Sequence, residues 1–173
     1  YSYDTFDNCV VEFTVVRREV ELVAKNENDS AIGINVNAGE YSEFYGVYRD
    51  GGLMLDHEYK WDNMIKFGQG NLPFSIQTTE NENNFDKAFD IKIIKHGNTF
   101  SIYARLNGES EYIYVGTQTS RFNLSKASIG LRVTTSYPLH HFFYNEKVYS
   151  FTDDNLPAEI AKSLDVTCNA GGT

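Results

Sequence analysis

The fold of this chain is decided by residues 89–108, which read FDIKIIKHGNTFSIYARLNG. Apolar side chains recur there at every second position, first over 89–93 and then over 100–106. A period of two is typical of a strand that turns one face to a core. Gly97-Asn98 and Asn107-Gly108 interrupt the pattern, and such pairs supply the positive φ that tight hairpins need. The stretch therefore predicts antiparallel strands joined by short turns.

The same alternation continues on both sides of this stretch. It predicts further strands, separated by polar turns, at residues 9–16, 17–25, 31–37, 43–49, 53–59, 74–78, 112–117, 128–135 and 142–151, where 17–25 is either a separate strand or a continuation of 9–16. Only residues 156–166 have a helical spacing, since Leu156, Ile160 and Leu164 lie four apart and Pro157 suits a first helical turn. The sequence thus predicts an all-β fold, a two-sheet antiparallel β-sandwich (jelly roll) with one short C-terminal helix.

Length and charge limit the number of domains and the classes of partner that the chain can have. The 173 residues suit a single sandwich domain over 1–170, with 171–173 as the start of a linker or tail. Because the chain begins without an initiator Met, we expect a processed part of a larger multidomain protein. The net charge of −9 argues against a nucleic-acid partner, which needs a clustered basic surface. No run approaches the ~20 apolar residues of a membrane helix, so no membrane insertion is expected.

The two cysteines, Cys9 and Cys168, stand near opposite ends of the chain. They form no C-x-x-C pair, so the spacing gives no support to a thiolate metal site or a redox motif. We expect a disulfide between them that joins the terminal segments, provided that the protein is exported. The alternative is two free thiols.

Four segments together carry a resemblance to a known family. They are residues 89–103, Asn107-Gly108, Tyr114-Val115-Gly116 and Ile129-Gly130-Leu131-Arg132. Their order resembles the concanavalin A-like lectin/glucanase superfamily, and most closely its laminin-G-like and xylosidase-C-terminal-like carbohydrate-binding modules. The resemblance implies a curved jelly roll that frequently binds carbohydrate and sometimes holds a structural calcium. It carries no catalytic residues.

Sugar recognition combines aromatic rings, which stack on pyranose faces, with polar groups that bond the hydroxyls. If the apolar alternation faces the core, one outward face carries Tyr103, Arg105, Tyr112, Tyr114 and Arg132. A second set comprises Tyr48, Arg49, His57, Tyr59 and the single tryptophan, Trp61. Two alternatives stay open, because tyrosine also suits an exposed strand and a lone tryptophan is often a core anchor.

Residue patterns that would indicate catalysis or metal binding are weaker than those for sugar recognition. Retaining glycosidases need two carboxylates on one face, and Asp56-His57-Glu58 is the nearest approach, with nothing to complete the motif. His140 and His141 are adjacent in an expected strand, so they point to opposite faces. Acidic loops at 26–29, at 153–154 and at Asp4 and Asp7 could contribute oxygen ligands to calcium, without matching a fixed ligand loop.

The sequence therefore leads to a specific expectation. We expect a non-catalytic carbohydrate-binding module, not an enzyme, that belongs to a secreted or cell-surface polysaccharide-active protein and binds a glycan by aromatic stacking and polar contacts. One alternative is a structural or adhesive domain that contacts protein. The other is a glycan-cleaving enzyme.

Overall fold

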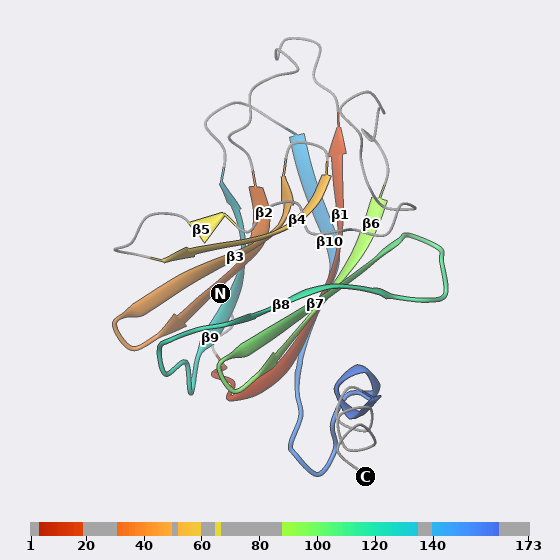
Figure 1. Cartoon of the computed structure of the whole chain (residues 1–173). Helices are drawn as coiled ribbons and strands as arrows, with labels where there is room; N and C mark the ends of the chain where they lie inside the picture. The colour runs from red at the N-terminus through yellow and green to blue at the C-terminus, as the bar shows by residue number, and fades with distance from the viewer. Residues whose placement is uncertain are drawn as a thin grey trace.

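In the parts of the chain that the structure describes, the strands form two antiparallel sheets of five strands each (Figure 1). The computed structural model describes residues 4–18, 31–49, 52–59, 65–66, 88–134 and 140–162, and side chains within 4–16, 33–42, 88–132 and 144–162. The first sheet has the order β10 (His140–Ser150), β1 (Asn8–Arg18), β6 (Ala88–His96), β7 (Thr99–Leu106), β8 (Ile113–Thr119). The second has the order β5 (Ile65–Lys66), β4 (Gly52–Tyr59), β3 (Tyr41–Arg49), β2 (Ala31–Ala38), β9 (Ser128–Thr134). The predicted all-β sandwich is confirmed.

The core lies between the sheets and is filled by the period-two residues that the sequence indicates. From the first sheet come alternate residues of β1, β6 and β7, and from the second come residues of β2 and β9. The largest of these fully buried side chains are Phe89, Ile91, Ile93, Phe100, Ile102 and Ile34. Ile113 and Val115 of β8 pack against the same core, which leaves their neighbours to face outward.

The two predicted turns in residues 89–108 are present. Gly97 and Asn98 alone connect β6 to β7, and Gly97 has a φ of 59°. At the end of β7 the Glu109 amide donates to the Leu106 carbonyl oxygen at 3.0 Å, while Gly108 has a φ of 95°. Both backbone conformations are in the region that glycine enters without steric cost. The second turn leads into a short connection before β8, so it is not a two-residue hairpin loop.

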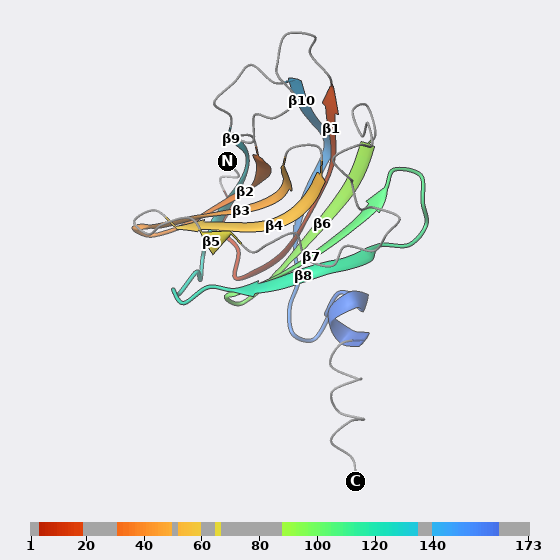
Figure 2. The same cartoon turned by 45° about the horizontal axis from the view of Figure 1, so that its top comes forward.

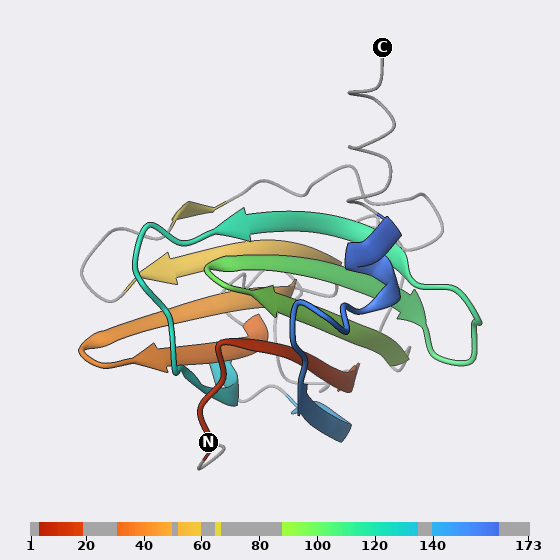
Figure 3. The same cartoon turned by 90° about the horizontal axis from the view of Figure 1, so that it is seen from below.

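A second, smaller core lies on the outer face of the first sheet. Val10 and Ile94 point away from the main core and pack with Phe151 and Ile160 from the C-terminal segment. A helical turn covers 158–162, inside the predicted range 156–166, and the Ile160 amide donates to the Pro157 carbonyl oxygen at 3.0 Å. Figures 2 and 3 show this turn outside the sandwich, against the first sheet.

Among the described side chains, two ionisable groups lie in the main interior of the sandwich, Cys9 and Lys95, which pair across β1 and β6. Lys95 is fully buried and its Nζ donates to the carbonyl oxygens of Asp7 at 2.6 Å and Gly97 at 2.8 Å. Burial lowers the pKa of Lys95. Burial also raises the pKa of Cys9 to about 12, against the opposing charge of Lys95.

Cys9 is a free thiol, and Cys168 lies outside the described residues. The predicted disulfide is therefore unsupported: the Cys9 side chain lies in the core between the sheets, and no described residue pairs with its thiol. The strand predicted at 74–78 and residues 19–25 of the strand predicted at 17–25 also lie outside the described parts of the chain.

We predict that Phe100→Ala destabilises the fold by about 3–5 kcal/mol, because it removes a fully buried ring and leaves a cavity between the sheets. Urea unfolding monitored by circular dichroism measures the change. Glu109→Ala, at an exposed position in the turn after β7, is the matched control and should stay within about 0.5 kcal/mol of the parent chain. Equal losses for the two variants would contradict this assignment of the core.

Candidate functional site

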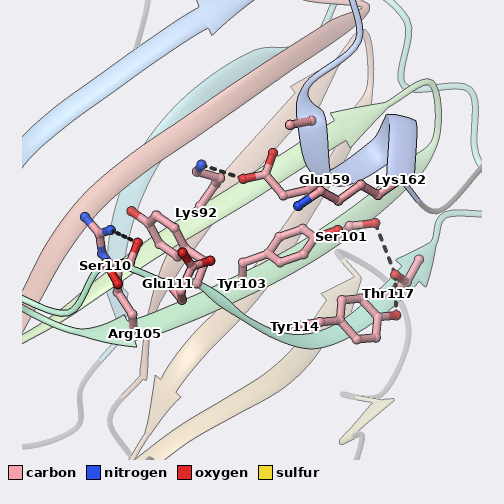
Figure 4. A pocket seen from close by; sticks show the side chains of 12 residues that line it. Lys92, Ser101, Tyr103, Arg105, Ser110, Glu111, Tyr114, Thr117, Glu159 and Lys162 are labelled. Atoms are coloured by element: carbon pink, nitrogen blue, oxygen red, sulfur yellow. Dashed lines mark hydrogen bonds and ion pairs between the residues drawn. The ribbon is translucent and has the colours of Figure 1, made fainter.

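A cavity of about 670 Å³ lies on the outer face of the first sheet, between the strands and the C-terminal helical turn. Side chains of β6 and β7 form its floor. One wall comes from β8 and the segment before it, and the opposite wall comes from the C-terminal helical turn. Figure 4 shows side chains from all of these elements directed toward one space. The residues that line it are Lys92, Ser101, Tyr103, Arg105, Ser110, Glu111, Tyr112, Tyr114, Thr117, Ala158, Glu159 and Lys162.

Strand register explains why these side chains meet. Lys92 pairs with Tyr103 across β6 and β7, and Tyr103 pairs with Tyr114 across β7 and β8. Directly paired residues of an antiparallel sheet point to the same face. The neighbours of these residues on either side belong to the core, so the alternation sends the whole row outward.

Three tyrosines give the cavity its aromatic surface, and they differ in how exposed and how firmly held their rings are. The rings of Tyr103 and Tyr114 meet edge to face at 5.6 Å, and Tyr114 is 54% exposed. The Tyr112 ring is contacted by two cations, with Lys92 Nζ at 4.4 Å and Arg105 Cζ at 4.3 Å from its centroid. Cation–π contacts of this length stabilise the ring in place. Tyr114 is therefore the ring most open to a ligand, and Tyr112 is the ring most firmly held.

A buried carboxylate fixes Arg105. The Arg105 Nε donates to Asp90 Oδ2 at 3.0 Å, and its Nη1 donates to the Ser110 carbonyl oxygen at 3.1 Å. Asp90 Oδ1 accepts from Thr14 Oγ1 at 2.8 Å and from Asn107 Nδ2 at 2.9 Å. Burial alone would raise the pKa of Asp90, but these three hydrogen bonds outweigh it and lower the pKa. The guanidinium is thus held by an ionised partner beneath the cavity.

A second charged group ties the helical turn to the sheet. Lys92 Nζ donates to Glu159 Oε1 at 2.7 Å and lies 3.4 Å from Glu12 Oε1 (Figure 4 shows the shorter contact). Burial would raise the pKa of Glu159, yet the hydrogen bond and charge of Lys92 outweigh it and lower the pKa. Burial would lower the pKa of Lys92, and the bond to Glu159 reverses that to a raised pKa. Both groups are therefore charged at neutral pH.

The phenols of the cavity stay protonated under the same conditions. Burial raises the pKa of Tyr103 and of Tyr112. Their hydroxyl groups can donate as well as accept hydrogen bonds. The Tyr114 hydroxyl shares a hydrogen bond of 2.7 Å with Thr117 Oγ1, which in turn lies 3.1 Å from Ser101 Oγ. This edge of the cavity is a continuous line of hydroxyl groups.

Four of the five residues expected on one outward face, Tyr103, Arg105, Tyr112 and Tyr114, line this cavity together. Arg132 does not join them. It lies on β9, which pairs with β2 in the second sheet, and its Nη1 donates to Asn35 Oδ1 at 3.2 Å. Periodicity predicts which face of its own strand a residue occupies, but it carries no information on which sheet the strand joins.

The second expected set lies on the other sheet. Tyr48 and Arg49 belong to β3, and His57 and Tyr59 to the neighbouring β4. Their side chains, and Trp61 as a whole, are outside the described residues. The same holds for the side chains of Asp56 and Glu58 on β4 and of His140 and His141 on β10.

Sequence reasoning missed several groups at this site. Lys92 could have been found, because it stands between core residues Ile91 and Ile93 and must point outward. Glu159 and Lys162 have no such signal, since their place depends on where the helical turn docks. Among the side chains that the structure describes, no group of three or more His, Cys, Asp or Glu could hold a metal ion, and calcium stays an expectation. In the same residues no helix has the length and apolarity to cross a membrane.

Comparison with known proteins gives structural matches alone. No family model matches the chain, and no curated protein matches it. A functionally unknown protein from Saccharomyces cerevisiae matches with a TM-score of 0.47 and 14% identity, over 86% of this chain and 72% of the other. A xylan β-1,4-xylosidase from Bacillus halodurans matches with a TM-score of 0.48 and 17% identity, over 82% of this chain and 27% of the other. The catalytic domain of a glycoside hydrolase family 131 protein from Coprinopsis cinerea matches with a TM-score of 0.41 and 12% identity, over 89% of this chain and 61% of the other.

All three matches have TM-scores below 0.5 and identities of 12–17%, so they show neither a family nor an activity for this chain. Two of the three structures are nevertheless glycoside hydrolases, and this finding contradicts the prediction that the chain is not an enzyme. The prediction rested on the absence of a familiar catalytic motif in the sequence, and the absence of a motif excludes no activity.

We predict that the Lys92–Glu159 ion pair makes stability depend on pH at the acid side. Because the folded state lowers the pKa of Glu159 from its ordinary 4.5, the contribution is present above that value and is lost as the pH falls through the lower folded pKa. Urea unfolding from neutral pH downward should show Glu159→Gln about 1 kcal/mol less stable at neutral pH, with the difference closing in acid. The Asp90 network is unchanged in this variant, so the comparison isolates Glu159. A difference that stays constant with pH would contradict it.

Proposed function

We propose that the cavity on the outer face of the first sheet binds carbohydrate. The observation that carries this proposal is the exposed Tyr114 ring, which stands beside a fixed row of hydrogen-bonding groups. An aromatic face next to ordered hydroxyl and guanidinium groups suits a pyranose, which has apolar C–H faces and a rim of hydroxyls. The similarity to structures of glycoside hydrolases agrees with the proposal without carrying it.

The polar groups of the cavity are positioned before any ligand arrives. Asp90 holds Arg105, and Thr117 is bonded to both Tyr114 and Ser101. A preorganised site loses little conformational entropy on binding. Three cations, Lys92, Arg105 and Lys162, and two carboxylates, Glu111 and Glu159, line the space. The site therefore lacks the strong negative charge of the chain as a whole, and it suits neutral or weakly acidic sugars. We further propose that the chain belongs to a secreted or cell-surface protein that acts on polysaccharides.

We predict that Tyr114→Ala weakens binding about tenfold, because it removes the open stacking face, while Tyr114→Phe retains most of the affinity. Affinity gels that contain xylan, β-glucan or mannan, followed by titration calorimetry with the retained polysaccharide, measure the change. Arg132→Ala on the second sheet is the matched control and should bind like the parent chain. Loss of binding with Arg132→Ala, but not with Tyr114→Ala, would move the site to the other sheet.

A second candidate function is hydrolysis of the bound glycan, and one observation favours it. Glu12 and Glu159 both contact Lys92 Nζ, at 3.4 and 2.7 Å, so their carboxylate oxygens lie about 6 Å apart or closer. Glycosidases use two carboxyl groups, and retaining enzymes place them about 5 Å apart. Such catalysis would need a protonated acid, whereas Lys92 lowers the pKa of Glu159. A substrate would therefore have to displace Lys92 from Glu159 before Glu159 could act as the acid.

We predict that, if the site is hydrolytic, reducing sugar is released from the retained polysaccharide and that Glu159→Gln and Glu12→Gln each lower the rate at least a hundredfold. Chromatography of the products over time measures the release. Glu109→Ala, an acidic residue outside the cavity, is the control. Binding without release from the parent chain would overturn hydrolysis and leave the carbohydrate-binding proposal standing.

A further inference from the structure

We propose that the carbohydrate site continues beyond the cavity, across β6 and β1 to β10, the outermost described strand of this sheet, and accepts an oligosaccharide laid across the strands. This inference rests on the proposed function, because it assigns a ligand of greater length to the same site. It adds a second contact region, formed by Tyr144 and Tyr149, that lies outside the cavity.

The strand register places a continuous row of side chains along this path. Lys147 of β10 pairs with Glu12, Glu12 pairs with Lys92, and Lys92 continues through Tyr103 to Tyr114. All of these positions belong to the outer face, since their neighbours Val11, Ile93 and Ile102 fill the core. Neighbouring strands lie about 4.8 Å apart, so the row spans roughly 19 Å from β8 to β10. A single sugar ring is far shorter than this row.

A bulge in β10 brings two tyrosines to the same face at the far end. Between the pairs Glu12–Lys147 and Thr14–Tyr144 the strand β10 has one residue more than β1, and Asn145 has a φ of 56°. Without the extra residue, strict alternation would send Tyr144 and Tyr149 to opposite faces. With it, both stand on the outer face on either side of the row, 42% and 45% exposed.

The middle of the path is polar and connected. The Tyr149 hydroxyl donates to Glu12 Oε1 at 3.3 Å, Glu12 contacts Lys92, and Lys92 contacts Glu159 at the cavity wall. On one side of the row the outer face is closed, because Val10 and Ile94 are buried beneath Phe151 and Ile160. The helical turn therefore borders the row of side chains on this side. Aromatic rings stand at the two ends of the row and charged groups lie between them, which suits a chain of hydroxylated rings better than an apolar protein surface.

The test is titration calorimetry with linear oligosaccharides of increasing length, from mono- to hexasaccharide, in the β-1,4-xylan, β-1,4-glucan and β-1,3-glucan series. The parent chain is compared with the double variant Tyr144→Ala/Tyr149→Ala. Val148→Ala is the matched control, because Val148 is on the same strand, similarly exposed, and paired with the core residue Val11. Circular dichroism establishes that each variant is folded.

We expect the affinity of the parent chain to rise with ligand length, and the double variant to lose about tenfold for the longest ligands and nothing for the shortest. Full retention of the length dependence by the double variant, with loss of binding in Tyr114→Ala, would overturn the extension and leave the cavity site standing. Failure of the parent chain to bind any ligand of the three series would overturn the proposed function and the extension together. An equal loss in Val148→Ala would also overturn the extension, because it would show an effect of the strand and not of its outer face.

Discussion

Strand β6 is covered on both of its faces, and this constraint organises the rest of the protein. Phe89, Ile91 and Ile93 enter the main core, while Asp90, Lys92 and Ile94 occupy the opposite face. A strand with two covered faces needs a partner layer on each. The second sheet provides one layer. The other is assembled from the C-terminal turn, Arg105 and the neighbouring tyrosines, and the cavity is the part of this layer that remains open.

The two faces of β6 are stabilised by different physics. The inner face is apolar and depends on the removal of hydrocarbon from water. The outer face combines one apolar contact, at Ile94, with a carboxylate and an ammonium group that are fully paired. Buried charges are costly unless their hydrogen bonds are satisfied, so this face tolerates few substitutions. That rigidity also gives the candidate site its fixed geometry.

Much of this arrangement could be predicted from local pattern, and the remainder depends on contacts that local pattern does not encode. Alternation around Phe100 was enough to predict that Tyr103 and Arg105 face outward, because the period of a strand is two residues. It could not place Arg132, whose strand joins the second sheet through long-range pairing with β2. Glu159 was equally inaccessible, since it reaches Lys92 across 67 residues of sequence. Lys95 continues the core-facing series of β6 and is accommodated by two backbone carbonyls that no sequence pattern signals.

The extra residue in β10 also bears on how the molecule behaves in a concentrated solution. An edge strand presents unpaired amide and carbonyl groups that a neighbouring molecule can extend into a longer sheet. The backbone at Asn145, with its left-handed φ, interrupts the regular spacing of those groups. An approaching strand would meet the edge in register on one side of the bulge and out of register on the other. We therefore expect the same irregularity that orients two tyrosines to disfavour edge-to-edge pairing at β10, the outermost described strand of its sheet.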